Sequence, residues 1–255
     1  MKDIICHLDM SGLDQDTLVS KVGTAWKKNY NAYHIFNVSH KLNTIEMYEE
    51  LAESLGKIRL CHPVNNRETK FSKSRDIKYQ PGVNHYFVSN SRQPLHTDYA
   101  YYEASEAPDW LMLYCIKPSE FGGKTHILSS ETLQLILEKY NPDLLAKINI
   151  DVTWKYNGKD GDKVHQKPIY DGKNISWNYW QIKEELNTPE IMRIREEFFR
   201  FLEDVIMGGS IYDLSKIWTA GDCLLFSDRL NLHGRDAFLG DRWLKDHAFY
   251  RKPLI

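Results

Sequence analysis

The chain has 255 residues, of which 42% are hydrophobic and 27% charged, and its formal net charge is −2. This length suits one large domain, and the near-neutral charge without a basic stripe argues against nucleic acid or an anionic membrane as a partner. The N-terminus lacks the apolar core of a signal peptide, no apolar run reaches membrane-spanning length, and the four cysteines are scattered. We therefore expect a soluble, cytoplasmic protein without a disulfide framework.

Two amphipathic helices are predicted near the N-terminus. In residues 14–29, the apolar positions that share one face are Leu18, Val19, Val22 and Trp26. In residues 43–56, Thr44 is placed to cap a helix and Gly56 to end it. The apolar face of this second helix contains Ile45, Tyr48, Leu51, Ala52 and Leu55.

A buried strand and further helices follow. Residues 109–116 form a continuous apolar run, which is typical of a strand buried on both faces. Residues 129–148 predict one or two helices broken near Asn141 and Pro142. Residues 189–206 give the clearest helical pattern, with a predicted buried stripe of Ile191, Ile194, Phe198, Leu202 and Val205.

The apolar patterns of residues 222–235 and 242–253 predict strands again. The chain has no repeat, no low-complexity tract and no glycine- and serine-rich linker. We therefore expect a single domain over residues 1–255, with N-terminal helices, a β core and a helical or loop insertion at about 129–215. Helices followed by interrupted strands favour an antiparallel β architecture over a doubly wound sheet.

The stretch QPLHTDYAYY, residues 93–102, places an imidazole and a carboxylate two positions apart, at His96 and Asp98. On an extended segment the two side chains would point to the same side, because side chains alternate along a strand. Two imidazoles and one carboxylate commonly hold iron(II) in oxygen-activating enzymes. His233, at the end of an apolar strand, is the strongest candidate for the second imidazole. A lone His-x-Asp is a weak signal, and a polar patch on an ordinary strand is the alternative.

Two further features favour the metal site. The sequence EFGGKT, residues 120–125, follows the predicted buried strand, and Arg242 follows His233 at the start of another strand. A cosubstrate with a carboxylate tail needs a fixed cation, and the planar fork of arginine suits that role.

Residues 83–128 and 218–251 together resemble the iron(II)/2-oxoglutarate-dependent dioxygenases. Within these they resemble the branch that contains taurine dioxygenase, clavaminate synthase and γ-butyrobetaine hydroxylase. The resemblance is carried by His-x-Asp, Gly-Gly-x-Thr, Gly-Asp before a strand, and His-Gly-Arg before Arg-x-Leu, in this order. It implies a mainly β fold with flanking helices, built on a double-stranded β-helix, the jelly-roll of clavaminate synthase.

The resemblance also implies roles for single residues. His96, Asp98 and His233 would ligate the iron and so be the catalytic residues. Thr125 would donate a hydrogen bond to 2-oxoglutarate, and Arg242 would clamp its distal carboxylate.

Other arginines are alternatives for the clamp. Arg251 is one, but alternation from Arg242 places it on the opposite strand face, which favours Arg242. Arg235, two residues after His233, is another, and it could equally contact a substrate carboxylate or brace the site.

Substrate contacts are predicted from the aromatic residues of the insertion and of the metal stretch. Within residues 151–185, Trp177, Tyr179 and Trp180 could wall a pocket, and the alternative is that they are core aromatics. If the extended conformation continues past Asp98, Tyr102 shares its face. Asn84 and His85 are further candidates, with a structural role as the alternative for His85.

The implied activity uses iron(II), 2-oxoglutarate and O2 and releases succinate and CO2. We expect hydroxylation of an unactivated C–H bond in a small, amino-acid-like metabolite, with desaturation or cyclisation by the same chemistry as an alternative. The sequence does not specify the oligomeric state. A non-catalytic, cupin-like metal-binding jelly-roll is a second possibility, and a zinc hydrolase ranks last because no HExxH motif is present.

Overall fold

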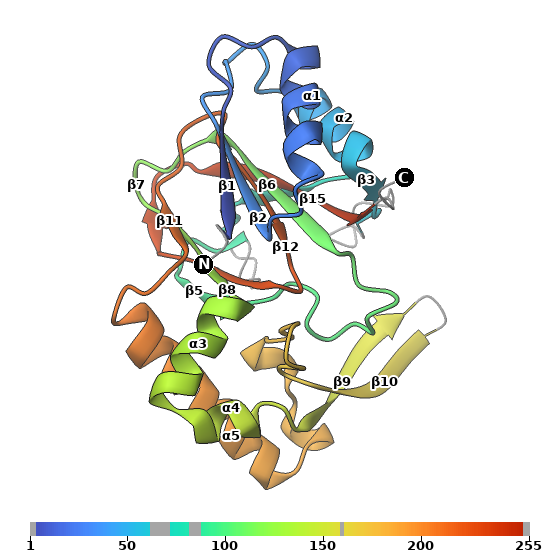
Figure 1. Cartoon of the computed structure of the whole chain (residues 1–255), viewed down its shortest axis with the longest axis vertical. Coiled ribbons are helices and arrows are strands. Elements are labelled where there is room, and N and C mark those ends of the chain that lie inside the picture. Colours follow the sequence, from blue (N-terminus) through green and yellow to red (C-terminus); the bar gives the residue numbers. More distant parts are fainter. Residues whose placement is uncertain (1–3, 62–71, 82–87, 159–160, 252–255) are drawn as a thin grey trace.

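Two β-sheets form the centre of the structure (Figure 1). The computed structural model describes residues 4–61, 72–81, 88–158 and 161–251. The larger sheet contains, in spatial order, β1 (Ile5–Asp9), β2 (Ala32–Phe36), β12 (Cys223–Ser227), β6 (Trp110–Lys117), β15 (Trp243–Arg251) and β3 (Gly56–Ile58), and β4 (Arg75–Lys78) also pairs with β15. The smaller sheet contains β11 (Leu214–Lys216), β8 (Thr125–Ser129), β13 (Asn231–Arg235) and β5 (Gln93–His96).

All of these strand pairs are antiparallel except β1 with β2, which is parallel. Two short antiparallel pairs lie outside the main sheets: β9 (Asp151–Gly158) with β10 (Gly161–Pro168), and β7 (Phe121–Gly122) with β14 (Phe238–Leu239). The prediction of a mainly β architecture with antiparallel sheets and flanking helices is therefore confirmed.

The position of strand β6 explains its continuous apolar sequence, because other residues cover both of its faces. Trp110, Met112 and Tyr114 belong to the cluster beneath the N-terminal helices. Leu111 and Leu113 point the other way, into a cluster shared with Ile127 and other residues of the smaller sheet. A strand buried on both faces needs apolar residues at every position, which is the continuous run seen in residues 109–116.

The helices α1 (Gln15–Trp26) and α2 (Ile45–Leu55) cover the outer face of the larger sheet (Figure 1). The side chains of Asp14 and Thr44 cap them by accepting from backbone N–H groups of the first turn. Helix α2 ends before Gly56, as predicted, but not through a left-handed glycine. Gly56 is extended, with φ −164°, and it begins β3, where a Cβ would collide with Phe249 and Tyr250 of β15.

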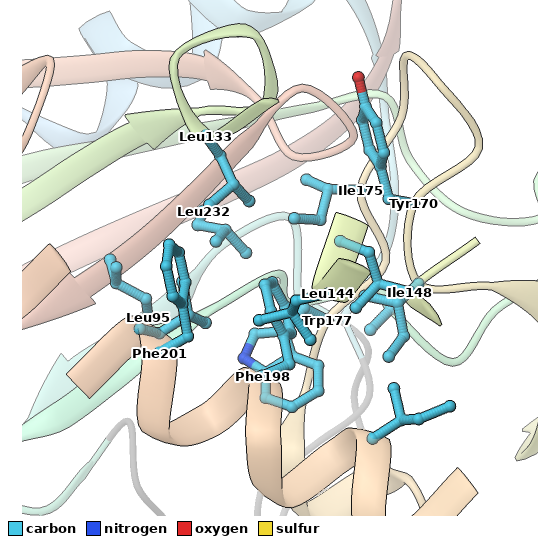
Figure 2. Close-up of a cluster of buried hydrophobic side chains, with 14 of the residues drawn as sticks. Leu95, Leu133, Leu144, Ile148, Tyr170, Ile175, Trp177, Phe198, Phe201 and Leu232 are labelled. Atoms are coloured by element: carbon cyan, nitrogen blue, oxygen red, sulfur yellow. The ribbon is translucent and has the colours of Figure 1, made fainter. Parts of the chain in front are cut away.

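The insertion forms a second layer against the smaller sheet. Its helices are α3 (Ser130–Tyr140), α4 (Pro142–Lys147) and α5 (Pro189–Arg200), and α5 continues as a π-helical segment, Phe201–Met207. The predicted break is confirmed, because Asn141 ends α3 and its side chain caps α4. Figure 2 shows the shared core, in which Phe198 and Phe201 of this layer lie beside Leu95 and Leu232 of the smaller sheet.

The π-helical segment corrects one predicted core residue. Ile191, Ile194, Phe198 and Leu202 are buried as expected, but Val205 is 37% exposed and Ile206 is fully buried instead. The backbone N–H of Gly208 bonds to the carbonyl of Glu203, five residues back. This wider turn delays the return of the buried stripe by one residue.

None of the helices in the described ranges is both long enough and apolar enough to cross a membrane.

Candidate metal centre

Three potential metal ligands come together beside the paired strands β5 and β13 of the smaller sheet: His96, Asp98 and His233. His96 ends β5 and lies directly opposite His233 of the neighbouring strand β13. Asp98 Oδ1 is 3.2 Å from His96 Nε2 and 3.7 Å from His233 Nε2. One donor atom from each of the three residues lies within 4.8 Å of the others, which is a spacing that one metal ion can bridge.

The proximity of His96 and Asp98 has a different cause from the one predicted. The strand ends at His96 and the chain turns at Asp98, so side-chain alternation does not apply. Instead, the buried carboxylate of Asp228 accepts hydrogen bonds from the backbone N–H groups of Asp98 (3.0 Å) and Tyr99 (2.9 Å). Asp228 thereby holds the turn that directs Asp98 back toward the imidazoles.

A glycine sets the distance between the two histidine strands. A Cβ on Gly234 would lie 2.9 Å from the carbonyl oxygen of Gln93 on β5 and 3.2 Å from the backbone nitrogen of Leu95. Glycine removes this clash, so β13 and β5 approach closely and His233 reaches His96. Their ring centroids are 4.3 Å apart.

The protonation states of Asp98 and His233 suit metal binding. Burial raises the pKa of Asp98, but the hydrogen bond from His96 and the nearby His233 and Arg75 outweigh it, so the net shift is downward. Burial, with the nearby His96, lowers the pKa of His233 to about 3. Asp98 is therefore anionic and His233 neutral at neutral pH, and these are the forms that ligate. Burial lowers the pKa of His96, but the hydrogen bond with Asp98 and the charge of that carboxylate outweigh it, so the net shift is upward. Nδ1 of His96 is 2.9 Å from the carbonyl oxygen of Pro94, so a metal would bind at Nε2 in place of the proton shared with Asp98.

Two charged partners of the site were not found from the sequence. Arg75 of β4 lies 3.0 Å from Asp98 Oδ2, and its Nε donates to both oxygens of the fully buried Asp246 on β15. Arg75 therefore engages the oxygen of Asp98 that does not face the histidines. No local pattern predicts this contact, because it joins three distant segments.

The three residues line a cavity of about 490 Å³. The smaller sheet contributes His233, Gly234 and Thr125, the larger sheet Leu113 and Leu244, and the insertion a third wall. The residues of that third wall are Asn178, Trp180 and Gln181, and Trp180 and Gln181 belong to the 3-10 turn Tyr179–Gln181. Among the described lining residues, Asp98 carries the single carboxylate, whereas four arginines are present: Arg59, Arg75, Arg235 and Arg242.

Arg242 is a buried cation that faces this cavity. Its side chain is 2% exposed, and its Nε and Nη1 atoms have no hydrogen-bond partner in the described part of the chain. Burial, with the nearby Arg235, lowers its pKa to about 9. A buried guanidinium without a counterion is costly, so this end of the cavity is suited to an anion. Thr125 lines the same cavity, and its hydroxyl accepts from Trp218 Nε1 at 2.6 Å, which leaves its own proton free to donate.

The two alternative arginines lie differently. Arg251 stands over the ring of Trp26, 4.5 Å from its centroid, donates to the Trp26 carbonyl and does not line the cavity. Arg235 lines the cavity and also donates to the carbonyl oxygens of Ser89 (2.8 Å) and Ser91 (2.9 Å). It therefore braces the segment that precedes β5.

Of the candidate substrate contacts, Tyr102 and Trp180 line the cavity, whereas Trp177 does not. Trp177 is fully buried in the core of the insertion, with its ring centroid 4.7 Å from that of Phe198 (Figure 2). The alternative interpretation, a core aromatic, therefore holds for Trp177. Tyr102 reaches the cavity through the turn after Asp98 and not by strand alternation.

Tyr179 packs against Phe199 and hydrogen-bonds to Glu196, outside the cavity lining. Asn84 and His85 lie outside the described residues. Four further residues line the cavity and were not predicted from the sequence: Arg59, Tyr99, Asn178 and Gln181.

A two-sheet jelly-roll that brings two histidines and one aspartate beside a buried arginine defines a class, the mononuclear non-haem iron oxygenases. The chain belongs to the family described as taurine catabolism dioxygenase TauD, TfdA family, whose model matches residues 34–246. This membership confirms the predicted class, an iron(II)- and 2-oxoglutarate-dependent oxygenase. A comparison with curated protein sequences gives no significant match.

Solved structures of several oxygenases have the same fold. An asparagine oxygenase in complex with Fe(II), 3-hydroxyasparagine and succinate is 13% identical, with a TM-score of 0.61 over 92% of this chain and 79% of that one. The non-heme iron oxygenase OrfP, in complex with iron and α-ketoglutaric acid, is 12% identical, with a TM-score of 0.62 over 94% and 81%. PvcB from Pseudomonas aeruginosa is 17% identical, with a TM-score of 0.57 over 96% and 82%. These similarities confirm the double-stranded β-helix fold, here with sheets that do not close into a barrel.

Proposed function

We propose that the chain hydroxylates an unactivated C–H bond of a small, amino-acid-like metabolite, with succinate and CO2 as co-products. The observation that carries this proposal is the meeting of the His96, Asp98 and His233 donors with the buried, unpartnered Arg242 in one cavity. The amino-acid part is supported by similar structures: one is an asparagine oxygenase with bound hydroxyasparagine, and another contains (3S)-hydroxy-L-arginine.

In this proposal, His96, Asp98 and His233 hold iron(II). The donor set fits, because it offers nitrogens of two buried imidazoles and one oxygen of a half-buried carboxylate from a largely preformed cluster. When bound, iron with 2-oxoglutarate and O2 supplies the oxidising power needed to break a C–H bond. Asp228 and Arg75 keep the Asp98 carboxylate aimed at the imidazoles, and neither needs to move for this role.

Thr125 and Arg242 bind 2-oxoglutarate in the same proposal. Arg242 offers its unpartnered guanidinium N–H groups to the distal carboxylate, and the anion in turn neutralises a charge that burial makes costly. Thr125 has its hydroxyl oxygen already engaged by Trp218, so its proton is directed away from that indole. Leu113 and Leu244 supply an apolar part of the lining of the same cavity.

The substrate occupies the part of the cavity bordered by the turn after Asp98 and by the insertion. A volume of about 490 Å³ suits a small molecule together with the cosubstrate. Tyr102 and Trp180 provide aromatic contacts there, and Arg235 fixes the segment that precedes β5. As part of the same proposal, residues 1–255 form one catalytic domain, since the insertion shares its core with Leu95, Leu128 and Leu232 of the smaller sheet.

The first test is an anaerobic titration of metal-free protein with iron(II) and then with 2-oxoglutarate. We expect a broad visible charge-transfer band that saturates with 2-oxoglutarate and is absent in Asp98→Ala. Bound iron without any band would instead favour the non-catalytic, metal-binding jelly-roll. Once a substrate is found, the product mass distinguishes hydroxylation, which adds an oxygen atom, from desaturation or cyclisation, which removes two hydrogens.

A further inference from the structure

The cavity contains more positive charge than the proposed cosubstrate needs. Four arginines line it, and among the described lining residues only Asp98 carries a carboxylate, while Asp246 behind the lining pairs with Arg75. Iron(II) and dianionic 2-oxoglutarate cancel each other in charge, so their binding leaves this excess unchanged. Arg75 is engaged by both carboxylates and Arg242 faces the 2-oxoglutarate end, which leaves Arg59 and Arg235 to consider.

Arg59 and Arg242 line the same cavity from well-separated points of the backbone. Its backbone nitrogen bonds to the carbonyl of Ala248, six positions along the same side of the cavity from Arg242, or roughly 20 Å of extended strand. Its neighbours Tyr99 and Tyr102 lie one and four residues after the proposed iron ligand Asp98 in the chain. Arg59 therefore contacts the turn that carries Asp98, whereas its backbone is well separated from that of Arg242.

The two tyrosines fix the Arg59 side chain without neutralising it. The guanidinium carbon is 5.1 Å from the ring centroids of both Tyr99 and Tyr102, and Nη2 donates to the Tyr102 hydroxyl at 3.2 Å. In the part of the chain that the structure describes, no carboxylate oxygen lies within ion-pair distance of Arg59. An arginine held in one orientation, lining a cavity, with donors to spare, is a preorganised site for an anion.

We propose that Arg59 binds a free carboxylate of the substrate, so that the enzyme acts on a small carboxylic acid and not on an amide or a carrier-bound thioester. This inference rests on the proposed function and narrows it. Tyr102, which accepts from Arg59, is free to donate its own hydroxyl proton to the same carboxylate. The wall across the cavity carries Asn178 and Gln181, whose amides suit the polar remainder of an amino acid.

The test uses the full chain loaded anaerobically with iron(II) and 2-oxoglutarate. The probes are the twenty standard L-amino acids and the α-carboxamide of each, and binding is followed as a perturbation of the charge-transfer band. We expect the acid that binds best to lose affinity about 10- to 100-fold when its carboxylate is replaced by the carboxamide, the range of a charged hydrogen bond. Arg59→Met should weaken the acid by a similar factor but leave the carboxamide and the 2-oxoglutarate midpoint unchanged, and Arg59→Lys should recover part of the affinity.

Lys57→Met is the matched control. Lys57 is an exposed cation two residues before Arg59 that does not line the cavity, so its removal tests for a general charge effect. Equal binding of acid and carboxamide, or an unchanged affinity in Arg59→Met, would overturn the Arg59 assignment while the band still supports the proposed function. Absence of the band in the unmodified protein would overturn both.

Discussion

Arg75 and Asp98 form an ion pair that engages only one of the two carboxylate oxygens of Asp98. Oδ2 of Asp98 is 3.0 Å from Arg75 Nη2, whereas Oδ1 faces the two histidines. A carboxylate held in this way is expected to offer a metal a single oxygen. This matters for an oxygenase, because the remaining positions around the iron must stay open for the cosubstrate and O2.

Removing Arg75 is expected to affect stability and metal binding together. Arg75→Met leaves the fully buried Asp246 without its partner, and breaking such a pair costs about 3–5 kcal/mol. Arg75→Met combined with Asp246→Asn should regain much of this loss in the free energy of unfolding, measured by urea denaturation. Both variants should bind iron(II) with a changed charge-transfer spectrum, since Asp98 is no longer held. An unchanged spectrum in the double variant would show that Arg75 does not orient Asp98.

Replacement of any single ligand should abolish turnover without unfolding the protein. His96→Ala, Asp98→Ala and His233→Ala each remove one of the three donor atoms of the cluster. We expect succinate formation and bound iron to be lost together, as measured by chromatography and metal analysis, with an unchanged circular dichroism spectrum. The control is His40→Ala, which changes an exposed histidine and should retain both properties. Full iron content with normal succinate release in Asp98→Ala would refute the assignment.

We expect opposite effects on cosubstrate binding and on stability from replacing Arg242 and from replacing Arg251. Arg242→Met should raise the KM for 2-oxoglutarate about 10- to 100-fold, because it removes a charged hydrogen-bonding group from a buried site. Arg251→Met should leave this KM unchanged and lower the melting temperature, since Arg251 packs on Trp26 and donates to its carbonyl. The reverse pattern would mean that the clamp is Arg251.

Replacing Trp177 is expected to lower mainly the stability of the protein, whereas replacing Trp180 is expected to weaken mainly substrate binding. Trp177→Ala should destabilise the protein by about 3–5 kcal/mol, because it opens a cavity beside Phe198 in the buried core. Trp180→Ala should cost less stability and mainly raise the KM for the substrate, since Trp180 lines the cavity. Denaturant titration and substrate kinetics on the same two variants check both statements, and equal losses of stability would contradict them.

We expect the free energy of unfolding to depend on pH above neutrality because of Lys167. Burial, with the nearby Arg229, lowers the pKa of Lys167 to about 8, whereas an unfolded chain has its ordinary value near ~10.4. Between these values the unfolded state binds the extra proton, so stability rises with pH across this window, by at most about 3 kcal/mol. Comparing the free energy of unfolding of wild type and Lys167→Met at about pH 7.5 and about pH 10, which together cover most of the window, isolates this contribution. A difference between the two proteins that is constant with pH would rule it out.

The sequence predicted those features whose cause is local or whose motif is specific. Thr44 caps a helix and Asn141 marks the break between two helices, as predicted, and the run at 109–116 is the doubly covered strand β6. Gathering of His96, Asp98 and His233 also agrees with the prediction, although the turn held by Asp228 replaces the expected strand geometry.

The features that were missed depend on contacts between distant segments. Arg75 meets Asp98 and Asp246 across 23 and 171 positions of sequence, and no periodicity relates them. Arg59 reaches the cavity because β3 pairs with β15, a pairing that the apolar pattern does not specify. Val205 left the buried stripe because of a π-helical turn, which a period of 3.6 residues cannot anticipate.

The walls of the cavity come from two parts of the chain, the paired sheets and the insertion. Residues of these two parts differ in how readily they can be replaced during evolution. His96 and His233 belong to paired strands of the smaller sheet, where a Cβ on Gly234 would collide with β5, and Arg242 immediately precedes β15. Asn178, Trp180 and Gln181 belong to a short turn of the insertion outside those sheets. New substrates can thus be acquired by exchanging residues of that turn, while the oxidative machinery is inherited unchanged. Directed evolution for altered specificity should begin there.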